Sequence, residues 1–165
     1  MTAARHGGKG LVALALLASG LVLALAPPTP TSAQTTERIV IDPRTGLAIS
    51  GFDPVGYFTD AKPMLGRPDL EYSFAGAAWR FSNEGNRAAF ADRPEIYMPR
   101  FGGYDPSAVA RGLATPGHPL VWLIAGKRLY LFHNTESRDL FVAEQEQTSA
   151  AAEGKWPSVQ AALAQ

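Results

Sequence analysis

Cysteine is absent from the 165 residues of this chain. Its absence excludes disulfide bonds, thiolate metal sites, thiol catalysis and a lipid-modified N-terminal cysteine. An excess of charge of one sign is also lacking, because Lys plus Arg and Asp plus Glu each total 15. A balanced chain without a basic run has no strong field for nucleic acid or an anionic membrane surface. We therefore predict no nucleic-acid partner.

Long apolar runs are lacking except at residues 11–26 (LVALALLASGLVLALA). Arg5 and Lys9 precede this run, and two prolines and the small residues Thr31-Ser32-Ala33 follow it. A basic start, an apolar middle and a small-residue end are typical of a secretory signal peptide, and the run is shorter than the roughly 20 residues that span a bilayer. We predict a signal peptide over residues 1–33; the alternative is a membrane anchor. Cleavage would leave 132 residues, exported to the periplasm or secreted and not bound to the membrane.

Residues 34–48 are interpreted as a lead-in and residues 49–165 as a single domain, in which no internal repeat is recognised. Residues 70–82 alternate apolar and polar side chains around Gly76, the pattern of an antiparallel hairpin. A helix then begins after Ser82 or Asn83 and ends near Ala91, because Pro94 blocks its continuation.

A second hairpin is predicted at residues 119–133, with Gly126-Lys127 as a type II′ turn. Both of its faces are apolar, which indicates the central part of a sheet. Short helices are expected at residues 106–112 and 135–152, and a last one begins at Lys155. The predicted fold class is α+β: a small antiparallel sheet built from two β-hairpins, with short intervening helices and C-terminal helices on one side.

Several motifs occur in a characteristic order: Asp53-Pro54-Val55, Tyr72-x-Phe-x-Gly-x-x-Trp-x-Phe-Ser, Glu84-x5-Phe90, Pro94-Glu-x-Tyr97, Gly102-Gly-Tyr104 and Trp156-Pro157. In this order and spacing the chain resembles the YHS domain, and more narrowly the small exported YHS domain-containing proteins. The broader group is similar to heavy-metal trafficking and sensing modules with a treble-clef-like core, whose cysteines hold copper(I) or zinc. The matching positions here are Gly56, Ser82 and Asn86, and Asp105-Pro106 stands where the exported subgroup has Cys-Ala. The resemblance therefore implies the fold with its thiolate metal site lost.

Two kinds of site remain as hypotheses. A pocket for a small ligand would lie around Tyr57, Tyr97 and the loop of Gly102, Gly103, Tyr104 and Asp105. Tyr97 and Tyr104 indicate this place because they flank a Pro/Gly-rich loop and carry a polar tip. Most of the other aromatic residues are interpreted as core.

A divalent metal is the one cofactor considered. If Gly126-Lys127 is the turn, His133 lies opposite Leu120 with His118 diagonal to it, and Asp105 would complete a two-His, one-carboxylate site. In the alternative interpretation both histidines lie hydrogen-bonded or solvated at strand ends, and Asp105 is a helix cap.

The carboxylates Asp53, Glu84, Glu95 and Asp105 are candidates for acid/base chemistry only as residue types, and Asp53 before proline is typical of a turn. No nucleophile elbow or phosphate loop is present. We therefore expect an exported, non-catalytic protein that binds an unknown small ligand or protein partner. A His/Asp metal binder is the first alternative, and an enzyme of unknown reaction is the second.

Overall fold

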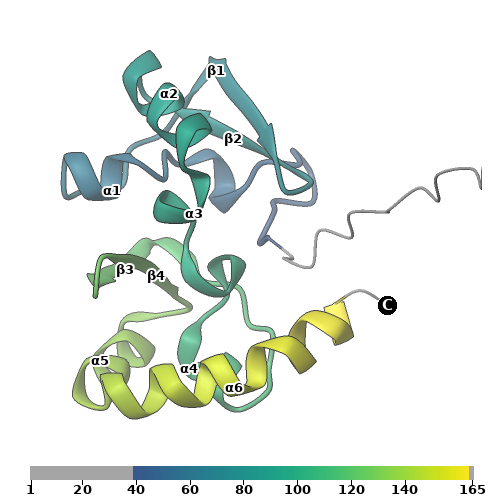
Figure 1. The fold of residues 1–165 in the computed structure, drawn as a ribbon, viewed down its shortest axis with the longest axis vertical. Coiled ribbons are helices and arrows are strands. Elements are labelled where there is room, and N and C mark those ends of the chain that lie inside the picture. Colours follow the sequence, from purple (N-terminus) through teal and green to yellow (C-terminus); the bar gives the residue numbers. More distant parts are fainter. Residues whose placement is uncertain (1–38, 164–165) are drawn as a thin grey trace, which may run out of the picture. The chain divides into compact units, whose positions relative to one another are not determined.

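The structure, a computed structural model, describes residues 39–163, which lie in one compact unit. The predicted signal peptide and most of the lead-in lie outside the described residues. The fold is α+β (Figure 1). In chain order its elements are η1 (Ile49–Gly51), α1 (Gly56–Thr59), β1 (Arg67–Phe74), β2 (Ala77–Phe81), α2 (Glu84–Asp92), α3 (Pro94–Tyr97), η2 (Arg100–Gly103), α4 (Pro106–Ala110), β3 (His118–Ala125), β4 (Arg128–Phe132), α5 (Thr135–Ala143) and α6 (Gln145–Leu163). Among these helices none combines the length and apolar character needed to cross a membrane.

Both predicted hairpins form, but they make two separate two-stranded sheets rather than one. The two faces of the β3–β4 hairpin are nevertheless both covered. Trp122, Ile124, Leu129 and Leu131 join one hydrophobic cluster, and Val121, Leu123, Tyr130 and Phe132 join another. The assignment of these residues to two faces is therefore confirmed, although the neighbours that bury them are not strands of the same sheet.

The turn of the second hairpin is type I′ and not the predicted type II′. Gly126 has φ 56° and Lys127 has φ 60°, so both central residues adopt the left-handed conformation. The first hairpin turns in the same way, with φ 52° at Ala75 and φ 76° at Gly76. Type I′ turns match the right-handed twist of the two strands, and here that match outweighs the cost of a positive φ at Lys127 and Ala75.

Two copies of one structural unit make up most of the chain, which corrects the expectation that no internal repeat is present. Module 1 is residues 49–90 and module 2 is residues 101–141. Each runs from a turn of three residues with positive φ, through Asp-Pro and a short helix, to a hairpin and a capped helix. The sequences Gly-x-Asp-Pro and Phe-x-Asn-x-x-x-Arg-x-x-Phe occur in both, at residues 51–54 and 81–90 in module 1 and at residues 103–106 and 132–141 in module 2.

The two modules also agree in irregular details. Arg67 pairs with Phe81 and His118 pairs with Phe132, in each case before a shift in register along the first strand of the hairpin. The glycine before this pair, Gly66 or Gly117, donates its N–H to a carbonyl of the Gly-x-Asp-Pro turn, at 2.9 and 3.0 Å. Bulges are conserved features within families, and the shared bulge and backbone contacts mark the two modules as an internal duplication of structure.

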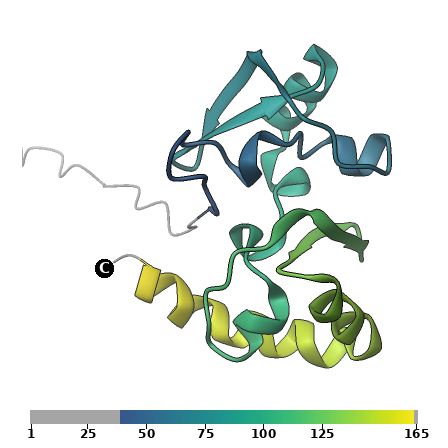
Figure 2. The same ribbon diagram turned by 180° about the vertical axis from the view of Figure 1, so that it is seen from behind.

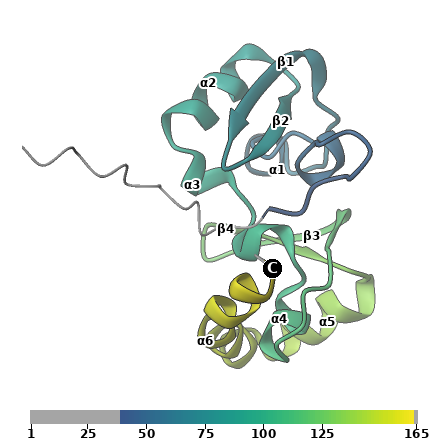
Figure 3. The ribbon, with the colours of Figure 1, turned by 90° about the vertical axis from the view of Figure 1, so that its right-hand side faces the viewer.

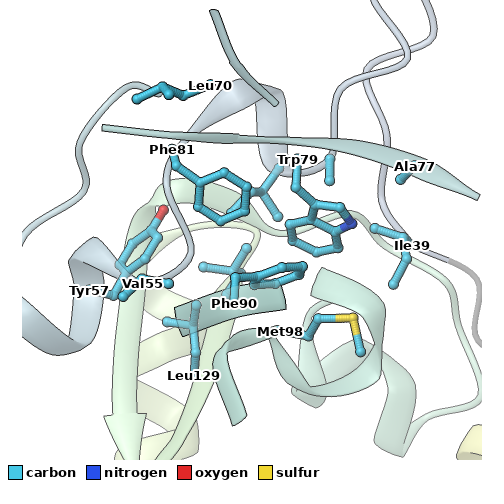
Figure 4. Close-up of a cluster of buried hydrophobic side chains, with 13 residues drawn as sticks. Ile39, Val55, Tyr57, Leu70, Ala77, Trp79, Phe81, Phe90, Met98 and Leu129 are labelled. Carbon is cyan, nitrogen blue, oxygen red and sulfur yellow. The ribbon is translucent and has the colours of Figure 1, made fainter. Parts of the chain in front are cut away.

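Each module centres on the phenylalanine of its second helix. In module 1 Phe90 of α2 packs against Trp79 and Phe81 of β2, at ring-centroid distances of 5.0 and 5.2 Å. Figure 4 shows both rings pointing from the strand toward Phe90, with Leu129 of β4 and Met98 completing the cluster. In module 2 Phe141 of α5 makes the equivalent contacts with Tyr130 and Phe132, at 5.0 and 5.2 Å.

The C-terminal helices differ from the prediction in where they break. The chain leaves α5 at Glu144, with φ −129°, and α6 then runs continuously through Pro157. Figure 3 shows α4, α5 and α6 on the same side of the β3–β4 hairpin, as predicted. Ala152, Trp156 and Val159 of α6 pack into the second cluster on both sides of the proline. This packing holds the helix together across the hydrogen bond that proline cannot donate.

Candidate functional site

The residues predicted to line a ligand pocket belong to the packed interior. Tyr57 is buried, its ring meets that of Trp122 edge-on at 5.3 Å, and its hydroxyl donates to the carbonyl oxygen of Pro119 at 2.9 Å. Burial, and then the charge of Asp53, raises the pKa of Tyr57 well above its usual value. Tyr97 is half-buried and packs edge-on against Phe58 at 5.5 Å. Both tyrosines therefore act as core residues with a polar tip.

The Gly102–Asp105 loop is likewise enclosed. Gly102 and Gly103 are buried, and their carbonyl oxygens accept the N–H groups of Val40 and Gly117 at 2.8 and 3.0 Å. Tyr104 is half-buried, pairs with Pro116 in an isolated bridge and lies with its ring centroid 6.1 Å from that of Trp156. None of the six residues predicted for the ligand site lines the groove described below.

Asp105 is a buried structural carboxylate. Its Oδ1 accepts the N–H groups of Ser107 and Ala108 and so caps α4, while Oδ2 accepts the N–H of His133 at 2.8 Å. The helix-cap interpretation of Asp105 is thus confirmed. The carboxylate joins the beginning of α4 to the end of β4, because one side chain satisfies backbone donors from both.

Asp53 holds the same position in module 1. Its Oδ1 accepts the N–H groups of Val55 and Gly56, and its Oδ2 accepts the N–H of Ser82 at 2.8 Å. The Ser82 hydroxyl and the Asn86 side-chain amide also donate to Oδ2, both at 2.7 Å. The side chains of Ser82 and Asn86 therefore both bind a buried aspartate.

A groove of about 640 Å³ lies where residues 40–52, blue in Figure 2, meet residues 116–120 at the beginning of β3. Its walls are mainly apolar and carry few polar side chains. The lining consists of Val40, Ile41, Asp42, Pro43, Ser50, Phe52, Pro116, Gly117, His118, Pro119, Leu120 and His133. A concave site of this size with few polar groups suits a small ligand.

His118 and His133 both line this groove. The shift in register pairs His118 with Phe132, the residue before His133. The expectation that His133 lies opposite Leu120 in a regular ladder is therefore wrong, because residues 119–121 bulge from β3. The bulge brings the beginning of β3 closer to the end of β4 than a regular ladder would.

The hydrogen bonds of the two imidazoles assign their tautomers. The Nδ1 atom of His118 accepts the N–H of Leu120 at 3.2 Å, so the proton of the neutral ring lies on Nε2. The Nδ1 atom of His133 lies 3.3 Å from the carbonyl oxygen of Pro116, which can only accept, so this nitrogen carries the proton. In the neutral form of both rings, His118 thus offers a free donor at Nε2 and His133 offers a free acceptor at Nε2.

The predicted metal site is not formed. Both oxygens of Asp105 are directed to backbone N–H groups, and over residues 39–163 no three His, Asp or Glu side chains are grouped to hold a metal ion. Coordination through Nε2 of His118 would also require the opposite tautomer and would cost the bond from Leu120.

Sequence reasoning identified the two histidines but not the groove. Residues 40–43 lie in the predicted lead-in and residues 50–52 at the beginning of the predicted domain, and no apolar periodicity marks them as the wall of a site. The internal repeat is the feature of the sequence that could have pointed to the groove. His118 and His133 stand where module 1 has Arg67 and Ser82, so they are positions at which the two copies have diverged.

Comparison with known proteins adds no relative. A scan against protein-family models finds no match, and searches of curated proteins and of solved structures find none either.

Proposed function

We propose that this protein is an exported, non-catalytic binding protein of the YHS type that holds a small ligand in the groove beside His118 and His133. The observation that carries the proposal is the groove itself, where two imidazoles face a mainly apolar lining. An apolar wall supplies affinity through the burial of the ligand's surface, and a few polar groups fix its orientation. The volume of about 640 Å³ corresponds to a ligand of metabolite or drug size.

A binding role is favoured over catalysis by the state of the buried carboxylates. Asp53 and Asp105 each accept backbone N–H groups at both oxygens, so neither has a free oxygen aimed at the groove. Asp42, the carboxylate in the lining, accepts the N–H groups of Arg44 and Thr45 through Oδ1. A general base needs a free atom within reach of a substrate proton, and neither Asp53 nor Asp105 offers one.

The YHS assignment rests on the order of the sequence motifs. The buried contacts of Trp79, Phe81 and Phe90 give these motif residues a structural role, as expected if the motif maintains a fold rather than a thiolate site. Export rests on residues 1–33, with their basic start, apolar run and Thr-Ser-Ala end.

The test is native mass spectrometry of the protein expressed in its own host with its own N-terminal segment. We expect a complex heavier than the polypeptide by the mass of a small molecule, and a polypeptide mass corresponding to residues 34–165. Ligand-free protein whose groove amides also do not shift when the neutral probe cyclohexylmethanol is added in ¹H–¹⁵N NMR would contradict the binding role. A mass that retains residues 1–33 would contradict cleavage.

A further inference from the structure

The groove histidines of module 2 are best understood by comparison with their counterparts in module 1. At the position of His133, module 1 has Ser82, whose hydroxyl is turned inward and donates to Asp53 at 2.7 Å. At the position of His118 it has Arg67, which forms a bidentate pair with Asp69. Both module 1 side chains are thus engaged by groups of their own module. In module 2 the two positions instead carry imidazoles that line a groove.

The backbone frame is the same in both copies, so the change is confined to the side chains. Asp105 accepts the N–H of His133 as Asp53 accepts that of Ser82, both at 2.8 Å. His118 and Arg67 occupy equivalent positions before the bulge of their hairpins. The two modules therefore share this scaffold, and at these two positions module 2 carries side chains with a ring nitrogen free for a ligand.

From these positions and hydrogen bonds we infer that the groove recognises an uncharged ligand with an apolar body and an adjacent acceptor and donor, of which a carboxamide is the simplest example. The inference rests on the proposed function and names its ligand class. The amide carbonyl accepts from Nε2–H of His118, and the amide N–H donates to Nε2 of His133. Ile41, Pro43, Phe52 and Leu120 contact the apolar body.

An uncharged amide suits the charges around the groove better than a carboxylate does. A carboxylate cannot donate to Nε2 of His133, and it would meet Asp42 in the same lining. A second carboxylate, that of Asp105, lies behind His133 and accepts its backbone N–H. The Tyr57 hydroxyl already donates to the carbonyl oxygen of Pro119. Among the described lining residues the charged or titratable side chains are Asp42 and the two histidines, so no lysine or arginine there compensates an anion.

The experiment uses two probes of nearly equal shape, cyclohexanecarboxamide and cyclohexanecarboxylate, with the protein purified as its host processes it. Long-range ¹H–¹⁵N spectra assign both tautomers before any probe is added. We expect the Nε2 tautomer for His118, the Nδ1 tautomer for His133, and about tenfold tighter binding of the amide at pH 7.5, because the carboxylate leaves one partner unpaired.

Two variants sharpen the test. His133→Ala should weaken the binding of cyclohexanecarboxamide about tenfold. His133→Gln should restore part of the lost affinity, because the glutamine side-chain oxygen can accept a hydrogen bond. Reversed tautomers or a preference for the carboxylate would overturn the inference and leave a binding groove. If neither probe shifts the groove resonances, and cyclohexylmethanol does not either, both the inference and the proposed function fail.

Discussion

The carboxylate of Asp105 accepts the backbone N–H of His133 at 2.8 Å, although the two residues are 28 positions apart in the chain. Module 1 repeats this contact between Asp53 and Ser82, also at 2.8 Å. The aspartate of each Gly-x-Asp-Pro turn therefore fixes the residue that follows the hairpin of its module. In module 2 that residue is one of the two imidazoles of the groove.

Replacing this aspartate by asparagine should destabilise the fold. In Asp105→Asn the retained oxygen still caps α4, but the new amide meets the N–H of His133, so two donors face each other in a buried site. We expect a loss of about 2–4 kcal/mol in the free energy of unfolding, measured by urea denaturation. Asp42→Asn is the matched control, because this turn keeps its acceptor oxygen at a more exposed site; it should change stability by less than about 0.5 kcal/mol. Equal effects of the two substitutions would contradict the role given to Asp105.

Tyr57 should make stability depend on pH in the alkaline range. Burial, and then Asp53, raises the pKa of its hydroxyl in the folded protein. The unfolded chain therefore loses this proton first, near pH 10, and the stability of the fold decreases as the pH rises above that value. The slope contributed by this one group reaches about 1.4 kcal/mol per pH unit.

The difference between wild type and Tyr57→Phe isolates this contribution from the other tyrosines. At pH 7 the variant should lose about 1–2 kcal/mol, because the carbonyl of Pro119 loses its donor. Between pH 10 and 11 the difference in the free energy of unfolding between wild type and Tyr57→Phe should become smaller in urea titrations, since phenylalanine does not ionise. Parallel pH profiles for the two proteins would show that Tyr57 is not a buried, proton-retaining group.

The duplication makes a prediction about two glycines that are far apart in sequence. A Cβ at Gly66 would lie 2.4 Å from the backbone carbon of Arg80, and one at Gly117 would lie 2.7 Å from the carbonyl oxygen of Gly103. Alanine at either position should therefore lower the free energy of unfolding by about 3 kcal/mol or more, because the backbone must move to make room for the Cβ. Gly154→Ala in α6 has open space and should stabilise by about 0.5–1 kcal/mol. Thermal unfolding of the three alanine variants measures these effects. If alanine destabilised the protein at Gly66 but not at Gly117, the equivalence of these two positions would be contradicted.

The first hairpin turn offers a stabilising substitution. Ala75 has φ 52°, a conformation that asparagine adopts more readily than alanine, and Asn-Gly is a favoured type I′ pair. Ala75→Asn should therefore stabilise by about 0.5–1 kcal/mol in urea denaturation. Gly76→Ala, at φ 76° in open space, is the opposite control and should destabilise by about 1 kcal/mol. A destabilising Ala75→Asn would indicate that this turn is not type I′ in solution.

Local sequence patterns predicted much of the fold. The alternation of residues 70–82, the turns at Gly76 and Gly126-Lys127, and the caps Asn83, Asp105 and Asn134 all correspond to observed elements. Long-range packing was less accessible. Pro157 lies inside α6 because Trp156 and Val159 are anchored in a cluster, which local propensity does not encode.

The site was predicted less well than the fold, and the reason is geometric. A regular ladder was assumed for the second hairpin, whereas three residues bulge from β3 and change the partner of His118. The polar tips of Tyr97 and Tyr104 suggest pocket lining, but the ring of Tyr97 packs edge-on against Phe58 and that of Tyr104 lies beside Trp156. Alignment of the chain with itself would have shown that His118 and His133 stand where the first copy has Arg67 and Ser82.

A matched pair of leucines tests most directly whether the groove beside His118 and His133 binds a small ligand with an apolar body, as we propose. Leu120 lines the groove and is 56% exposed, whereas Leu113 is 54% exposed and is not part of the lining. Neither substitution to serine should disturb the core. In calorimetric titrations with cyclohexanecarboxamide, Leu120→Ser should weaken binding about fivefold through lost apolar contact, and Leu113→Ser should leave it unchanged. Equal affinities for wild type and both variants would contradict the claim.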